Sequence, residues 1–170
     1  MPSVTLKGKP YEIKAKIPKV GESAPDFTFV KKDFTEGTLY DDYEGLVKVL
    51  IAVPSLDTGV CQAEARRFNE ELSKRAGVVG IVISMDLPYA MTRFCTAEGL
   101  ANIVTASDYR YSDFVGEYNT SIIEGPMKGL SARAVFVVDQ KEMIRYAELV
   151  PEIGQEPEYE KVLAAVDKLL

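Results

Sequence analysis

The sequence predicts an α/β or α+β domain built on a mixed β-sheet. Continuous aliphatic runs, which suit buried strands, alternate along the chain with segments whose apolar residues recur at helical spacing. A hairpin pattern and one more helical pattern then close the chain. The chain has 170 residues, and no repeat, low-complexity tract or linker divides it. We therefore expect one domain over residues 1–170.

Three strand patterns precede Pro54. Two short strands flanking a turn sequence predict an N-terminal β-hairpin. A short alternating strand follows, and then a β-branched and aliphatic run with one lysine, which is typical of a central buried strand. The predicted ranges are 4–6 and 11–13 for the hairpin, 26–30 for the alternating strand and 46–53 for the central strand.

A helical pattern begins just after Pro54. Apolar residues recur at spacings of four, three, four and four, at Cys61, Ala65, Phe68, Leu72 and Ala76. This spacing places them on one face of a helix over 57–76. Asp57 or Thr58 can serve as its N-cap, and Gly77 can close it. In open sheets ligands bind at the carboxyl ends of strands, which is where 54–61 lies.

The remaining elements alternate in the same way. A buried strand leads to a helix that Asp86 and Pro88 open and Gly99 ends. A short strand, a helix capped by Asp108, an irregular stretch, a β-hairpin and a C-terminal helix follow. The predicted ranges are 78–84, 88–98, 103–106, 108–118, 119–131 and 134–138 with 143–150, and the last helix starts at about 157.

Composition narrows the chemistry. The chain has no histidine, which excludes Ser-His-Asp and Cys-His nucleophile pairs and histidine-ligated metals. Two cysteines are too few for a four-cysteine zinc site or a disulfide-rich secreted scaffold. The net charge of −6 disfavours nucleic acid as a partner. No signal-peptide pattern opens the chain and no apolar run approaches a membrane span, so we expect a cytoplasmic protein.

Cys61 is the candidate nucleophile. In the first turn of a helix, free N–H groups and the helix dipole favour a thiolate. A helix terminus typically supplies only about 0.3–1 kcal/mol, so a second donor must contribute, and without histidine it must be Arg, Lys or a hydroxyl. Cys61 also falls on the apolar stripe, and spacing alone favours core packing and reactivity about equally.

Pro54, Thr58 and Cys61 form the pattern P-x-x-x-T-x-x-C, and the longer string is Pro-Ser-Leu-Asp-Thr-Gly-Val-Cys. The chain resembles the peroxiredoxin family through this signature, and in particular its thiol peroxidase subgroup, the atypical two-cysteine peroxiredoxins. The resemblance extends over essentially the whole chain, including Cys95 in its expected helix and Arg133 before its strand.

The resemblance implies a thioredoxin-like fold and a role for each matching residue. Cys61 matches the peroxidatic cysteine, whose thiolate attacks a hydroperoxide and becomes a sulfenic acid. Cys95 matches the resolving cysteine, which forms an intramolecular disulfide with it. Thr58 and Arg133 match the groups that bind thiolate and peroxide, and Pro54 matches the residue that shields the thiolate.

The resemblance also implies the partners. The substrates would be alkyl hydroperoxides and hydrogen peroxide, the reductant thioredoxin, and the assembly a homodimer, with neither metal nor cofactor. Two other hypotheses remain. A thioredoxin-type disulfide reductase needs a close cysteine pair, usually C-x-x-C, but Gln62, Ala63 and Glu64 follow Cys61. A non-enzymatic interaction domain with incidental cysteines is compatible with the sequence. Peroxide consumption with and without thioredoxin separates the three.

Overall fold

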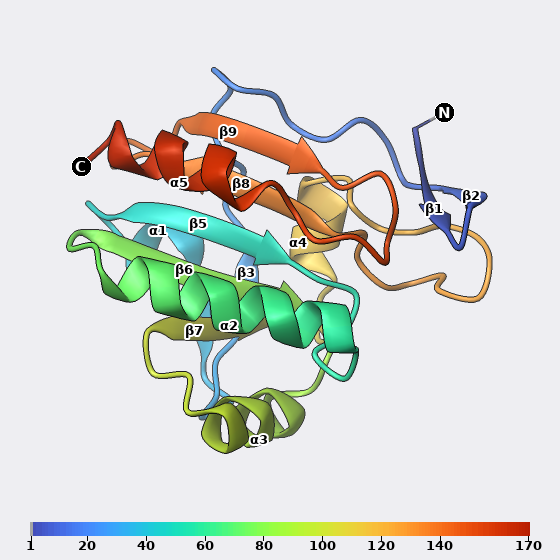
Figure 1. The fold of residues 1–170 in the computed structure, drawn as a ribbon, viewed down its shortest axis with the longest axis horizontal. Coiled ribbons are helices and arrows are strands. Elements are labelled where there is room, and N and C mark those ends of the chain that lie inside the picture. Colours follow the sequence, from blue (N-terminus) through green and yellow to red (C-terminus); the bar gives the residue numbers. More distant parts are fainter. Residues whose placement is uncertain (1) are drawn as a thin grey trace.

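The computed structural model describes residues 2–170, which form a seven-stranded mixed sheet with helices on both faces and a separate N-terminal hairpin (Figure 1). The strands are β1 (Ser3–Leu6), β2 (Lys9–Glu12), β3 (Thr28–Val30), β4 (Glu36–Thr38), β5 (Val47–Ala52), β6 (Val78–Ser84), β7 (Ile103–Ser107), β8 (Ala134–Val138) and β9 (Ile144–Leu149). The helices are α1 (Leu39–Asp42), α2 (Gly59–Ser73), α3 (Pro88–Glu98), α4 (Asp113–Glu117) and α5 (Tyr159–Asp167). Among residues 2–170, none of these helices is both long and apolar enough to span a bilayer.

The sheet has the strand order β4-β3-β7-β6-β5-β8-β9. Strands β5, β6 and β7 are parallel, whereas β8 and β9 return antiparallel beside β5. This arrangement confirms the predicted mixed sheet and the predicted N-terminal hairpin. The carboxyl end of β5 lies beside the amino end of β8, because Ala52 pairs with Ala134. This pairing brings the segment after β5 next to the segment before β8.

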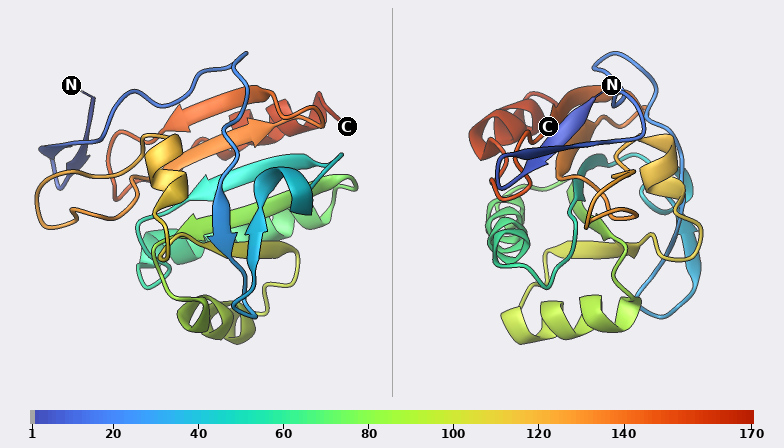
Figure 2. Two further views of the ribbon diagram at one scale, coloured as in Figure 1. Left: turned by 180° about the vertical axis from the view of Figure 1, so that it is seen from behind. Right: turned by 90° about the vertical axis from the view of Figure 1, so that its right-hand side faces the viewer.

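The two faces of the sheet are covered by different helices. Helices α2, α3 and α5 lie on one face, while α1 and α4 lie on the other (Figures 1 and 2). Alternate residues of β5 point into two different hydrophobic cores. Val49 and Ile51 face the core beneath α2, α3 and α5, and Leu50 and Ala52 face the core beneath α1 and α4. Because both of its faces are buried, β5 is apolar at every position except Lys48, instead of alternating between apolar and polar residues.

The sequence also predicted several element ends correctly. Pro88 occupies the first turn of α3, and Gly99 closes the helix in the left-handed conformation with φ 67°. Of the two N-cap candidates for α2, Asp57 and Thr58, the structure has Thr58. The carboxyl end of α2 comes earlier than predicted, at Ser73, and Gly77 instead supplies the positive φ of 81° in the turn before β6.

Two segments differ from the prediction. Strand β4 and helix α1 were not anticipated, because a three-residue strand and a four-residue helix leave almost no periodic pattern. Helix α4 begins at Asp113, later than predicted, after Ser112 in the left-handed conformation. The Asp108 carboxylate still caps this helix, since it accepts hydrogen bonds from the N–H groups of Phe114 and Val115 at 2.9 and 3.1 Å.

Candidate active site

The loop between β5 and α2 is held against the end of β6. Asp86, which follows β6, accepts hydrogen bonds from the Ser55 hydroxyl and the Leu56 N–H, both at 2.8 Å. Pro54 is buried at the start of this loop. Asp86 was expected to open α3, but its carboxylate serves this loop and the Ser84 hydroxyl instead. The entry into α2 is therefore fixed by a carboxylate that lies just after the neighbouring strand β6.

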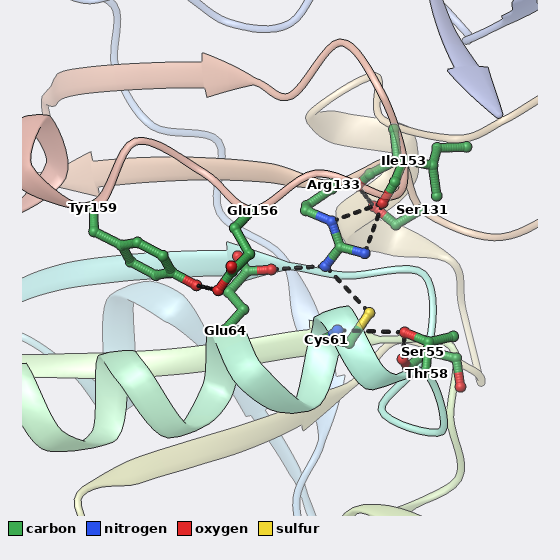
Figure 3. A network of polar contacts seen from close by, with 10 residues as sticks. Ser55, Thr58, Cys61, Glu64, Ser131, Arg133, Ile153, Glu156 and Tyr159 are labelled. Atoms are coloured by element: carbon green, nitrogen blue, oxygen red, sulfur yellow. Dashed lines mark hydrogen bonds and ion pairs between the residues drawn. The ribbon is translucent and has the colours of Figure 1, made fainter. Parts of the chain in front are cut away.

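Thr58 places Cys61 in the first turn of α2. The Thr58 Oγ1 accepts a hydrogen bond from the Cys61 N–H at 3.4 Å and donates one to the Ser55 carbonyl at 3.1 Å (Figure 3). Cys61 is completely buried, and its thiol is free. A sulfur in this position lies near the positive end of the helix dipole, which stabilises a negative charge on it.

Arg133 supplies the second donor that the sequence required. It immediately precedes β8, and its Nη1 donates to the Cys61 Sγ at 3.2 Å. Its Nε and Nη2 both donate to the Ile153 carbonyl, at 3.1 and 2.9 Å (Figure 3). With 1% of its surface exposed, Arg133 is a buried guanidinium aimed at the cysteine. Arg suits this position because it stays charged and presents a rigid fork of donors.

Glu64 completes the network, and the sequence analysis did not identify it as a site residue. Its Oε2 accepts a hydrogen bond from the Arg133 Nη1 at 2.7 Å, and its side chain is fully buried. Burial raises the pKa of Glu64 to about 7, although Arg133 opposes the shift. Its Oε1 has no hydrogen-bond partner among residues 2–170. The available signal was a carboxylate three positions after Cys61, on the core-facing side of α2.

Cys95 lies outside this network. It sits in the third turn of α3, half-buried, and forms no disulfide with Cys61. Burial raises the pKa of the Cys95 thiol, and the charge of Lys32 partly offsets this. Of the predicted site residues, Pro54, Thr58, Cys61 and Arg133 are gathered around the start of α2, whereas Cys95 belongs to a separate helix.

This geometry can stabilise an anionic sulfur and a second anionic atom beside it. The donors around the Cys61 Sγ are a guanidinium and the amino end of α2. Pre-oriented donors of this kind are most effective in a site from which water is excluded. The arrangement suits a thiolate nucleophile attacking a bond whose leaving atom gains negative charge.

Comparison with known proteins decides the family. The Redoxin family model matches residues 19–163. A thiol peroxidase from Leptospira interrogans is 52% identical over 172 aligned residues, covering all of both chains. The chain belongs to the Redoxin family, among its thiol peroxidases.

Other thiol peroxidases and peroxiredoxins resemble the chain over nearly its whole length. A thiol peroxidase from Aquifex aeolicus is 43% identical, covering 99% of this chain and 98% of its own. The crystal structure of a peroxiredoxin-like protein from the same organism superposes with a TM-score of 0.93 at 42% identity, covering 99% of this chain and 97% of that one. This similarity confirms the peroxiredoxin type of thioredoxin-like fold.

The pKa of Glu64 gives this thiol peroxidase family member a testable pH dependence. The carboxyl titrates near 4.5 in an unfolded chain and at about 7 in the folded one, so the folded state holds the extra proton between these values. Stability should therefore fall as the pH rises from about 4.5 to about 7, by an amount on the order of 3 kcal/mol, and then level off.

Urea unfolding across this pH range measures the effect. Glu64→Gln should remove most of the decline, whereas Glu70→Gln, on the exposed side of the same helix, should retain it. Because Asp108, with its pKa raised to about 6 by burial, titrates in the same direction, the difference between the two variants is the quantity to compare. Equal slopes in both variants would contradict the assignment to Glu64.

Proposed function

We propose that Cys61 reduces hydroperoxides as a thiolate nucleophile. The thiolate attacks the terminal peroxide oxygen, an S–O bond forms, the O–O bond breaks, and the departing alkoxide or hydroxide takes up a proton. The sulfur becomes a sulfenic acid, and alcohol or water is released. The observation that carries this proposal is the contact of 3.2 Å between the Arg133 Nη1 and the Cys61 Sγ at the amino end of α2. Suitable substrates are alkyl hydroperoxides and hydrogen peroxide.

The other residues around Cys61 take supporting roles. Arg133 stabilises both the thiolate and the charge that develops on the leaving oxygen. Thr58 caps the helix that carries Cys61, and its hydroxyl can turn towards the peroxide. Pro54, buried at the start of the loop, keeps water from the sulfur. Glu64 is a positioning residue, because it touches Arg133 rather than the reacting atoms.

Cys95 acts as the resolving cysteine in this proposal. Its thiolate attacks the sulfenic sulfur of Cys61, hydroxide leaves as water, and an intramolecular disulfide forms. Thioredoxin then reduces that disulfide by thiol–disulfide exchange. The presence of one free thiol besides Cys61 supports the assignment. A disulfide that forms and is reduced again in each cycle also suits the reducing cytoplasm, where protein disulfides are usually transient and catalytic.

Cys95→Ser tests the cycle directly. The variant should consume about one equivalent of peroxide per chain and then stop, since no second thiol intercepts the sulfenic acid. It should also convert to the sulfinic acid more readily than the wild type. Peroxide consumption with thioredoxin and its reductase, together with intact-protein mass, measures both effects. Normal thioredoxin-dependent turnover in this variant would exclude Cys95 as the resolving residue.

Disulfide formation should require local unfolding. Cys61 lies in the first turn of α2 and Cys95 within α3, and both helices are anchored to the same apolar core. A disulfide needs Cα atoms within about 7 Å and suitably aimed Cβ atoms, which two packed helices seldom offer. We therefore expect oxidation to unwind the start of α2, α3 or both. Amide exchange of reduced and oxidised protein tests this, and equal protection at 57–64 and 88–98 would contradict it.

We also propose that the protein is a homodimer. The exposed large apolar side chains include Tyr89 at 73%, Tyr111 at 56% and Leu87 at 49%. Tyr89 packs on Phe34 with ring centroids 4.7 Å apart, and Tyr111 donates a hydrogen bond to Glu36. Both tyrosines therefore contact the β3–β4 hairpin, at Phe34 in its turn and at Glu36 at the start of β4. A cluster of this kind is typical of a surface that another protein covers.

A further inference from the structure

A cavity of about 590 Å³ lies beside α3, and Cys95 is among the residues that line it. It arises because β3 pairs with β7 only at Val30 and Ser107, so that the first part of β7 has no strand partner on that side among residues 2–170. Helix α3 and the turn after β3 enclose the resulting space. The lining includes Lys31, Lys32, Met91, Cys95, Leu100 and Ile103, but neither Cys61, Thr58 nor Arg133.

The lining combines an apolar interior with a cationic rim. Leu100 and Ile103 are apolar side chains that keep some accessible surface here, 8% and 7%, whereas Met91 is fully buried in the wall. At the rim, Lys31 pairs with Asp42 at 2.5 Å, whereas Lys32 is exposed and has no ion-pair partner among residues 2–170. The Asp42 carboxylate balances the charge of Lys31, so Lys32 supplies the unpaired positive charge at this rim. An apolar chain ending in one anionic group is complementary to these features, and the volume lies within the usual range of about 300–1,000 Å³ for small-molecule sites.

We propose that this cavity binds a medium-chain alkyl carboxylate, with its chain against Leu100 and Ile103 and its carboxylate on Lys32. Cys95 is half-buried in the wall, so the bound chain shields its thiol. The ligand also contacts α3 in its folded form and therefore favours that form by mass action. If Cys95 is the resolving cysteine, as proposed above, the ligand slows the formation of the disulfide.

Decanoate is a suitable probe, and the reduced Cys61→Ser variant isolates the binding step from peroxide chemistry. Titration calorimetry should show saturable binding of decanoate, and the rate of Cys95 alkylation by iodoacetamide should fall with the same concentration dependence. Lys32→Glu should weaken binding at least ~10-fold, because the charge-assisted contact with the carboxylate is replaced by repulsion. Lys168→Glu, the same charge change at an exposed position after α5, should leave it unaltered. Decylamine, with a cationic head on the same chain, should not bind.

Three results would overturn the proposal. Absence of both calorimetric binding and Cys95 protection would exclude the cavity as a site. Equal binding of decanoate and decylamine, or equal affinity in the two lysine variants, would exclude carboxylate recognition by Lys32. In the wild type, decanoate should slow disulfide formation after one equivalent of peroxide, and an unchanged rate at saturation would exclude its effect on resolution. A failure of the wild type to form any disulfide without decanoate would instead contradict the proposed function, because the calorimetric test does not depend on it.

Discussion

Cys61→Ser should reduce peroxide consumption to the rate measured without protein. A serine hydroxyl is not ionised near neutral pH, and Arg133 together with the amino end of α2 cannot make it a nucleophile comparable to a thiolate. The measurement is peroxide consumption with thioredoxin, its reductase and an alkyl hydroperoxide. Circular dichroism confirms that the variant is folded, since the serine hydroxyl takes the place of a buried thiol.

Cys95→Ser is the matched control for this substitution. It makes the same thiol-to-hydroxyl change at the other cysteine, and it should still react with one equivalent of peroxide. The two variants together distinguish the attacking thiol from the resolving one. Substantial turnover by Cys61→Ser would show that another group is the nucleophile.

Arg133→Met should lower the second-order rate constant for peroxide reduction by roughly 10²–10³-fold, the usual effect of losing a donor that stabilises developing charge. Methionine fills much of the same space but donates no hydrogen bond to the Cys61 Sγ or the Ile153 carbonyl. Stopped-flow reaction of the reduced protein with peroxide measures the effect without involving thioredoxin. Arg133→Lys should recover only part of the rate, since one ammonium cannot reproduce the forked contacts.

The buried ion pair complicates this measurement, and Glu64 provides the means to correct for it. Removing Arg133 alone leaves a carboxyl group fully buried without its partner, which typically costs about 3–5 kcal/mol. The double variant Arg133→Met/Glu64→Gln has neither the guanidinium nor the buried carboxyl group, so it should regain much of the lost stability. Its peroxide rate should nevertheless stay as low as that of Arg133→Met. Recovery of the rate with the stability would mean that Arg133 acts only by holding the fold together.

The sequence predicted the elements whose pattern is local. The aliphatic run of β5 with its one lysine, the apolar stripe of α2 and the Pro88 to Gly99 limits of α3 each lie within one stretch of chain, where periodicity and capping chemistry are visible. The same holds for the chemical signature, because Pro54, Thr58 and Cys61 occupy one strand-to-helix junction. Local order was therefore enough to predict the fold class and to make Cys61 the candidate nucleophile, whereas it left both Asp57 and Thr58 as candidates for the cap.

Only the tertiary structure decided how the distant groups meet. The antiparallel pairing of Ala52 with Ala134 places Arg133 beside the start of α2, although 72 positions separate Arg133 from Cys61. Glu64 is identified as a site residue by its ion pair with Arg133, because the sequence alone does not show which buried group a carboxylate pairs with. The small elements β4 and α1 and the cavity beside β7 likewise depend on the divergence of β3 from the sheet. Contacts between segments far apart in the chain are set by strand order and packing, which periodicity along one segment does not encode.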